Sequence, residues 1–414
     1  MGTKDNKKGT IVLPIDVSNY EDFVEHPIKA HEIIGTYYIK HPDLFPKTMK
    51  EGYVLNGRTR ESKRKEGFQM RKIITGGQTY QIRPSFMLPY CKGEVREVSK
   101  GLFLLKFGVP FWALAFVFGH NAMWWYRLFI SLGCNDIVGT SIYESSDLPK
   151  DLIADEHHIR VRGKKKYVAT TVGDNCFLGM EVCDSASEEG LTQGYAVFKE
   201  EALNLNPDYE PNSVNTDGWA ATQNSWQKLF PKIVVIECFF HAFLKIRDRA
   251  TKKLKDFFNI AGDKIWNCYR ATSKRALSQQ IRRLREWTAA NVQNCPMKHN
   301  IMKLCSKKNR WMKHIDNVNA HRTSNMLDRL MRIMKKHKIN SQMFHSTTKV
   351  TTKNFRALAL LYNFTPSCPS VWKELPELKS PVARLNQKNY AKDWLENLLL
   401  SAAKHHFRHH SNSL

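Results

Sequence analysis

Three aspartates lie where side-chain packing alone gives little reason for a carboxylate. Asp155 interrupts the apolar run LIADEHHIRV, Asp217 ends the short alternation SVNTD, and Asp328 lies in the helical pattern HRTSNMLDRLMRIMKKH. A buried carboxylate is unfavourable unless an opposite charge or hydrogen bonds compensate it. Three carboxylates brought together repel one another, and divalent cations that prefer oxygen ligands relieve that repulsion. The residues therefore predict a site for two Mg²⁺ ions, or Mn²⁺ ions, of the kind that promotes phosphodiester chemistry.

Two of these aspartates also have simpler interpretations. Asp217 precedes Gly218, and Asp-Gly commonly opens a turn. Asp328 belongs to a helix face, spaced by three or four residues, that also contains Asn325, Arg332 and Lys335. This face suits a metal ion at one end and DNA phosphates along the rest, or it is an ordinary solvated face.

The charge distribution favours a polyanionic partner. The net charge is +25, and it divides into +6 for residues 1–150, −4 for 151–250, +12 for 251–320 and +11 for 321–414. Basic surfaces of this size usually bind nucleic acid, although a basic protein can also simply be soluble. An acidic segment between basic ones fits a metal site inside a DNA-binding protein.

The segment from residue 151 shows the alternating pattern of an α/β fold. Strands are predicted at 152–161, 166–172, 176–182, 213–217 and 232–237, with helices at 188–205 and 219–230. Short connections make the first three strands an antiparallel meander. This order predicts an RNase H-like mixed sheet core, in which the first and fourth strands lie side by side and bring Asp155 and Asp217 together. Basic helices to residue 319 form an insertion before the helix that contains Asp328.

Residues 96–133 contain three helical segments, VSKGLFLLKFG, VPFWALAFVFG and HNAMWWYRLFISLG. Two short helices joined by a glycine-containing turn predict an N-terminal helix-turn-helix region. In that geometry His120, Asn121 and Trp124 would enter the major groove of DNA and Arg127 would contact a phosphate. The alternative is a helical hairpin whose aromatic side chains form a core.

Several motifs together resemble the DDE-type insertion-sequence transposases of bacteria. HRTSNMLDRLMR resembles their Thr/Asn-Asn-x-x-acid element, and Cys238-Phe-Phe-His241 resembles the C-x-x-H motif of the Mutator-like branch. The resemblance spans residues from about 100 to 340. It implies DNA transposition, with Asp155, Asp217 and Asp328 as the catalytic and metal-binding acids and Cys238, His241 and Asn325 as supporting residues.

The chain departs from that family in its third acid, because most relatives have Glu where this sequence has Asp328. Glu156 and Glu237 are rival ligands. Each neighbours a matched position and is expected to point to the other side of its strand.

Two arginine- and lysine-rich clusters in the insertion are expected to hold DNA phosphates. The first comprises Arg282, Arg283 and Arg285, and the second Lys307, Lys308 and Arg310. Phosphate contacts position DNA without reading its sequence. The alternative is that these helices only dimerise or stay solvated.

The domain boundaries follow from these patterns. They are a basic β-hairpin region at 1–95, the helix-turn-helix region at 96–150, the first part of the core at 151–250, the insertion at 251–320, the last core helix at 321–345 and a basic tail region at 346–414. The uncharged stretch 107–126 contains glycine, proline, His120 and Asn121, so it is expected to break into two pieces, each too short to span a membrane. Scattered single cysteines suit a reducing compartment, so a cytoplasmic, nucleoid-associated protein is expected.

These observations together predict a transposase that acts on double-stranded DNA as a homo-oligomer. A nuclease on the same fold that does not transfer strands is the first alternative. The second is a transposase-derived DNA-binding protein without catalytic activity.

Overall fold

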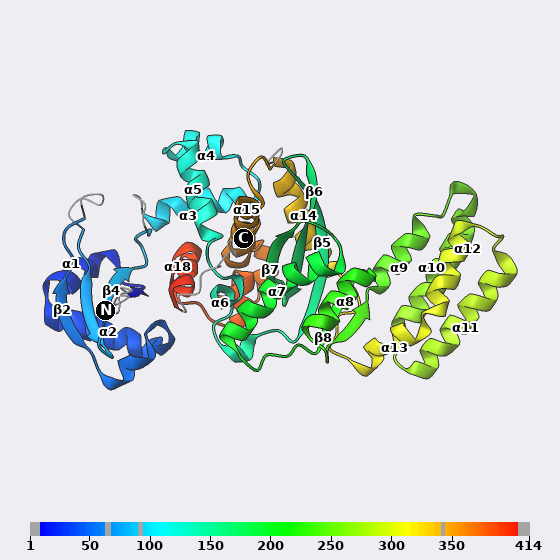
Figure 1. The fold of residues 1–414 in the computed structure, drawn as a ribbon, viewed down its shortest axis with the longest axis horizontal. Helices are drawn as coiled ribbons and strands as arrows, with labels where there is room; N and C mark the ends of the chain where they lie inside the picture. Colours follow the sequence, from blue (N-terminus) through cyan, green and yellow to red (C-terminus); the bar gives the residue numbers. More distant parts are fainter. Residues whose placement is uncertain (1–8, 63–67, 90–93, 341–343, 405–414) are drawn as a thin grey trace.

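The computed structural model describes residues 9–62, 68–89, 94–340 and 344–404. The described chain is α/β, with two mixed sheets and many helices, in agreement with the predicted class. Figure 1 shows an elongated molecule in which an N-terminal domain, a central sheet with its helices, and a helical bundle follow one another along the longest axis.

The N-terminal domain is a four-stranded sheet of order β1-β4-β3-β2. Its elements are β1 (Gly9–Leu13), α1 (Val17–Glu25), α2 (Pro27–Lys40), η1 (Pro42–Leu44), η2 (Lys47–Glu51), β2 (Val54–Arg58), β3 (Arg71–Thr75) and β4 (Gln78–Pro84). The β-hairpin expected within residues 1–95 is formed by β3 and β4 around Gly76 and Gly77, and both glycines have positive φ, as a tight turn between strands requires. The parallel pairing of β1 with β4 makes this region a folded domain, which local patterns did not predict.

Three helices follow, as the sequence indicates. They are α3 (Val95–Lys106), α4 (Phe111–Phe118) and α5 (Ala122–Leu132), and two short elements, α6 (Ile137–Ser141) and η3 (Ser145–Asp147), lead into the central sheet. Helix α5 packs against α15 (Thr348–Phe364), so the three-helix region is attached to the core.

The central sheet has the order β7-β6-β5-β8-β9. Its strands are β5 (Asp151–Val161), β6 (Lys164–Gly173), β7 (Cys176–Cys183), β8 (Ser213–Thr216) and β9 (Val234–Glu237). The predicted antiparallel meander β5-β6-β7 is confirmed, and β8 lies parallel to β5 on its other side. Every residue of β8 is buried, because β8 is paired on both sides and covered by helices.

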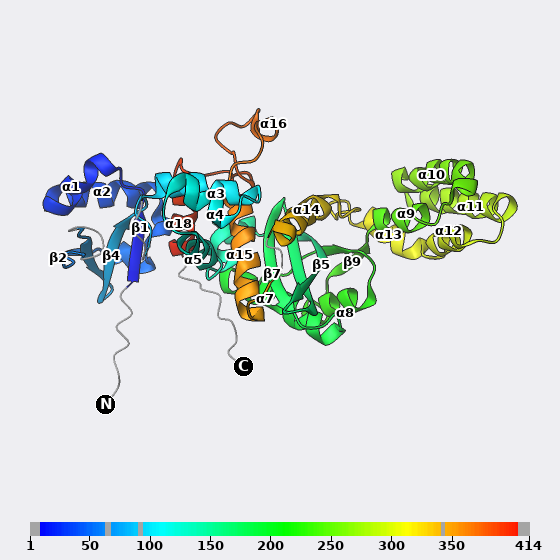
Figure 2. The ribbon, with the colours of Figure 1, turned by 90° about the horizontal axis from the view of Figure 1, so that it is seen from above.

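Helices cover both faces of this sheet (Figure 2). One face is covered by α7 (Glu188–Leu205) and α8 (Ala220–Leu229), and α14 (Asn325–Asn340) packs on β5 from the other. Neighbouring residues of one strand therefore meet different helices. The hydroxyl of Thr170 in β6, for example, lies 3.9 Å from the sulfur of Met334 in α14, whereas the side chain of Ala169 faces Gly194 of α7.

The basic insertion is a helical bundle with a hydrophobic core of its own. The insertion comprises η4 (Lys252–Leu254), α10 (Lys255–Arg270), α11 (Lys274–Asn291), α12 (Pro296–Ser306) and α13 (Lys308–Asp316), and the preceding helix α9 (Phe239–Arg247) packs in the same core. Apolar residues at helical spacing, such as Leu277, Ile281 and Leu284 of α11, are buried and leave the charged side chains outside.

The C-terminal region corrects the expectation of a tail as far as residue 404. It forms α15, α16 (Pro369–Trp372), α17 (Pro381–Asn386) and α18 (Trp394–Lys404), and the residues from 405 lie outside the described part. Helix α15 covers the free edge of β7, where Asn363 accepts a hydrogen bond from the N–H of Phe177 at 2.9 Å. Covering an edge in this way satisfies strand N–H groups that would otherwise lack partners.

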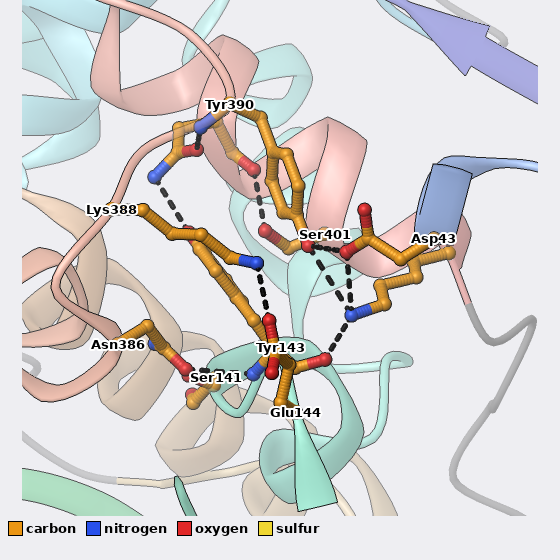
Figure 3. A network of polar contacts seen from close by, with 10 residues as sticks. Asp43, Ser141, Tyr143, Glu144, Asn386, Lys388, Tyr390 and Ser401 are labelled. Atoms are coloured by element: carbon orange, nitrogen blue, oxygen red, sulfur yellow. Dashed lines mark hydrogen bonds and ion pairs between the residues drawn. The ribbon is translucent and has the colours of Figure 1, made fainter. Parts of the chain in front are cut away.

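A polar network joins this C-terminal region to the N-terminal domain (Figure 3). Lys404 of α18 forms an ion pair with Asp43 at 2.9 Å, and the hydroxyl of Tyr390 donates to the same carboxylate. Lys404 also donates to the carbonyl of Tyr143, which lies between α6 and η3. The last helix therefore fastens the two ends of the described chain together.

Candidate metal centre

Strand β5 places Asp155 on the face that α14 covers. Asp155 lies opposite Thr170 in the register of β5 with β6, and Thr170 contacts α14 through Met334. The carboxylate accepts a hydrogen bond from the N–H of Glu156 at 2.8 Å.

Asp328 lies in the first turn of α14, where the preceding Ser324 holds it. The N–H of Asp328 donates to the carbonyl of Ser324 at 2.8 Å, and the hydroxyl of Ser324 donates to Asp328 Oδ2 at 3.1 Å. A carboxylate in the first turn also interacts favourably with the helix dipole. The start of α14 therefore fixes the position of this acid.

The C-x-x-H motif brings His241 to the same place from α9. Cys238 directly follows β9, and its sulfur accepts a hydrogen bond from the N–H of Ser324 at 3.3 Å. Ser324 Oγ lies 3.3 Å from Nδ1 of His241. Cys238, His241 and Ser324 therefore join the start of α9 to the start of α14.

Asp155, His241 and Asp328 form a compact group of half-buried side chains. One ligand atom from each lies within 4.8 Å of the others. The three residues come from β5, α9 and α14, which are far apart in the sequence. Two carboxylates and an imidazole so placed are a donor set that a divalent cation can bind.

Asp217 directly follows β8 and is not part of this group among the described residues. Its Oδ1 accepts a hydrogen bond from the N–H of Trp219 at 2.8 Å, which is the turn contact that Asp-Gly suggested. Burial is the main reason that the pKa of Asp155 is raised, and the charge of Asp217 adds to it. Because β5 and β8 pair in parallel with Ile153 opposite Asn215, Asp217 follows β8 on the side of Asp155, with its carboxylate bonded within its own loop.

The electrostatics of the group reflect crowded acids. Burial raises the pKa of Asp155 to about 6, and the charges of Asp217 and Asp328 act in the same direction. The hydrogen bond with Cys238 raises the pKa of His241 to about 9 against the opposing effect of burial, and the nearby acids contribute.

The two rival glutamates have partners elsewhere. Glu156 points to the opposite face, as expected, and accepts hydrogen bonds from Tyr195 at 2.6 Å and Thr222 at 2.7 Å. Glu237 is 6 % exposed and binds Lys307 and Arg310, the latter at 3.1 Å. Neither glutamate belongs to the group formed by Asp155.

The ion pairs of Glu237 involve two residues of a cluster that is expected to bind DNA. Lys307 and Arg310 already bind a carboxylate of the core, while Lys308 is half-buried at the start of α13. The other cluster, Arg282, Arg283 and Arg285, is exposed on α11. On α14, Arg332 and Lys335 are exposed, as is Asn325 at its first position.

The residues expected in the major groove lie at the start of α5. Asn121 caps this helix by accepting a hydrogen bond from the N–H of Trp124 at 2.7 Å. The rings of His120 and Trp124 stack with their centroids 4.0 Å apart, and Arg127 is exposed. Helix α4 beside them exposes apolar side chains, with Phe116 86 % exposed. A helix-turn-helix function for this region stays a prediction.

Ser324 is the residue of this site that the sequence analysis did not single out. It links Cys238, His241 and Asp328, which are brought together only by the tertiary fold. A signal was present, because Ser immediately before a helical pattern commonly caps a helix.

The comparisons add no relative to these observations. No family model matches the chain, and a search of curated proteins found no similar sequence. Within the described residues, no helix is both long enough and apolar enough to span a membrane.

Proposed function

We propose that this chain is a DNA transposase of the DDE type with an RNase H-like core. The observation that carries the proposal is the convergence of Asp155 and Asp328, from a central strand and a late helix, on one half-buried group with His241. The strand order β7-β6-β5-β8-β9, with an antiparallel meander followed by parallel strands, supports the RNase H-like assignment. The resemblance of HRTSNMLDRLMR and of the C-x-x-H motif to transposases supports the same function.

The donor atoms of the site fit a divalent cation. Asp155 and Asp328 would hold it, and Asp217 would join them by giving up its contact with the N–H of Trp219. Oxygen ligands suit Mg²⁺ and Mn²⁺, and an imidazole among them makes Mn²⁺ the stronger binder. When bound, two such ions supply activation of a nucleophilic oxygen and stabilisation of the leaving oxygen in phosphodiester chemistry.

The residues of the chain itself would position both the acids and the DNA. Ser324 and Cys238 hold His241 and Asp328 at the starts of their helices. The basic insertion would bind the backbone of double-stranded DNA next to the acidic core, which alone would repel it. The start of α5, with Asn121 and Arg127, would contact the ends of the mobile element. Two element ends must meet in transposition, so the chain would act as a homo-oligomer.

A cleavage assay on DNA tests this function. The substrate is a duplex with the DNA that flanks the gene encoding this chain, in Mg²⁺, in Mn²⁺ or in EDTA. We expect Asp155→Asn, Asp217→Asn and Asp328→Asn each to lower the cleavage rate at least about 100-fold. Their binding to DNA should stay near that of the wild type, because the basic surfaces are unchanged.

The matched control is Asp208→Asn, which removes an exposed carboxylate from the same core and should cleave normally. Cleavage without joining of the ends to a target duplex would indicate a nuclease. Binding without metal-dependent cleavage by the wild type would instead indicate a protein that only binds DNA. Full activity of Asp155→Asn would exclude that residue from the catalytic site.

A further inference from the structure

A pocket of about 140 Å³ lies between the central core and the basic insertion. Gly218 and Glu237 line it from the core, and Trp311 from the insertion. Lys245 of α9 and Lys303 of α12 line it as well, together with Lys307, which follows α12. We call it the lysine pocket. It is separate from the group formed by Asp155, His241 and Asp328.

The lysine pocket carries an excess of positive charge. Glu237 is the one carboxylate among its lining residues, and it binds both Lys307 and Arg310. Lys245 and Lys303 are exposed and form no ion pair with the described residues. Asn300 holds the backbone of Lys245 by donating to its carbonyl at 2.8 Å. Two ammonium groups are therefore available to an anion at a place that the fold fixes.

The pocket adjoins the loop that carries Asp217. Gly218, the next residue, has a φ of +90°, and a Cβ placed on it would lie 2.7 Å from Oε1 of Glu237. The chain thus passes directly over the Glu237 carboxylate, and only glycine allows that close approach. A ligand in the pocket would lie beside the end of β8, at the same edge of the sheet as the acids.

We propose that the lysine pocket binds a backbone phosphate of the DNA strand next to the stretch held at the acidic group. This inference rests on the proposed function. Lysine ammonium groups bind phosphate as compact point charges. The indole N–H of Trp311 is already bonded to the carbonyl of Leu304 at 2.9 Å, so this ring offers no donor to read a base. The pocket would therefore recognise the charge of the DNA backbone and not its base sequence. Because Glu237 pairs with Lys307 and Arg310, Lys245 and Lys303 are the lining cations that remain available to the phosphate.

The salt dependence of DNA binding tests the pocket directly. Fluorescence anisotropy with a random-sequence duplex is measured in EDTA at increasing KCl, for wild type and for Lys245→Gln/Lys303→Gln. The loss of one phosphate contact should make the plot of log affinity against log salt shallower by about 0.9. Affinity at low salt should fall several-fold. The control Lys29→Gln/Lys373→Gln removes the same charge from exposed positions outside the pocket and should keep the wild-type slope.

Glu237→Gln provides a test in the opposite direction. Removing this carboxylate frees Lys307 and Arg310, so affinity for the random duplex should rise several-fold. A purely structural role for Glu237 predicts unchanged or weaker binding. Circular dichroism shows whether Glu237→Gln is folded. If it is not folded, the test rests on the Lys245→Gln/Lys303→Gln variant. A pocket variant that matches the control in slope and affinity would overturn the proposal.

A free anion is the competing ligand. If inorganic phosphate binds the wild type but not the lysine variant, while the two bind the duplex with equal affinity and salt slope, the pocket binds a free anion and the proposal is wrong. Binding in EDTA needs no catalysis. An inactive chain with a lysine-dependent slope would therefore overturn the proposed function and leave the phosphate pocket standing. An active chain with an unchanged slope would do the reverse.

Discussion

Two groups of neighbouring acids in this molecule are compensated in different ways. Asp136 and Glu201 lie buried where α6 meets α7, and the fully buried Arg356 of α15 binds Glu201. Glu201 also accepts the N–H groups of Ile137 at 2.8 Å and Val138 at 3.1 Å. Asp155 and Asp328, in contrast, have the imidazole of His241 beside them, and no described lysine or arginine forms an ion pair with either.

The difference separates acids that the fold itself compensates from acids that we propose bind a metal ion. The carboxylate of Glu201 receives an arginine and two backbone donors from the chain itself, so the folded state already satisfies it. The carboxylates of Asp155 and Asp328 instead receive one hydrogen bond each among the described residues, from the N–H of Glu156 and the hydroxyl of Ser324. Acids that converge without an ion pair to lysine or arginine repel one another, and a divalent cation, as proposed for this site, would relieve that repulsion.

Replacing Arg356, the cation beside Asp136 and Glu201, should have the largest effect on stability. Arg356→Met leaves Glu201 buried without its arginine, and we expect the free energy of unfolding to fall by about 3–5 kcal/mol. Urea unfolding followed by circular dichroism measures this change. Asp155→Asn should leave the unfolding midpoint unchanged or raise it, because it relieves repulsion in a group that the fold does not compensate. Equal losses in the two variants would erase the distinction between the groups.

The stability of the protein should depend on pH because of Asp136, which is buried beside Glu201. Burial, with the adjacent charge of Glu201, raises the pKa of Asp136 to about 9, so folding favours its protonated form. The stability it contributes is complete below its unfolded pKa of about 4 and is lost as pH rises towards the folded value. Asp136→Asn cannot ionise and can still accept the N–H of Gly139, which caps α6.

Thermal unfolding between pH 5 and pH 8.5 tests this prediction. The wild type should lose melting temperature across that range, and Asp136→Asn should lose less. The exposed Asp208→Asn should follow the wild type. Parallel curves for Asp136→Asn and wild type would show that Asp136 does not titrate in this range.

The sequence predicted most of the central sheet because its signals are local. Alternation of apolar and polar residues and short connections placed β5, β6 and β7, and strand phase put Asp155 and Glu156 on opposite faces. The pairing of β1 with β4 joins residues about 70 positions apart, so no local pattern indicates it. Helix α15 was missed because it is buried nearly all round and lacks the one-sided stripe of a surface helix.

The sequence indicated Asp155, Asp328 and His241 of the candidate site, but it also placed Asp217 with them and did not indicate the contacts that hold the group together. Each aspartate interrupts an apolar or periodic pattern, which is visible along the chain. The contact of Ser324 with Cys238 and His241 depends on two helix starts meeting in space. The ion pairs of Glu237 with Lys307 and Arg310 have the same origin, and a count of basic residues cannot tell a cation bound inside the protein from one available to DNA.

The smallest effect is expected from Ser324, which tests whether the acidic group is a prepared ligand site. Its hydroxyl donates to Asp328 Oδ2 at 3.1 Å and lies 3.3 Å from His241 Nδ1, so Ser324→Ala frees both side chains. We expect a loss of about 1 kcal/mol in the free energy of unfolding. The Mn²⁺ concentration that half-saturates the rise in melting temperature should increase about tenfold or more, because residues that orient metal ligands affect affinity to that extent.

Ser324→Thr keeps the hydroxyl and should restore most of the Mn²⁺ response. Ser278→Ala is the matched control, since its hydroxyl is bonded within its own helix to the carbonyl of Lys274 at 2.8 Å. An unchanged Mn²⁺ midpoint in Ser324→Ala, with the expected loss of stability, would mean that Ser324 only fastens α14 to α9. In that case Asp155 and Asp328 would bind Mn²⁺ without being oriented by Ser324. The two groups of acids would then differ only in whether the chain supplies a cation.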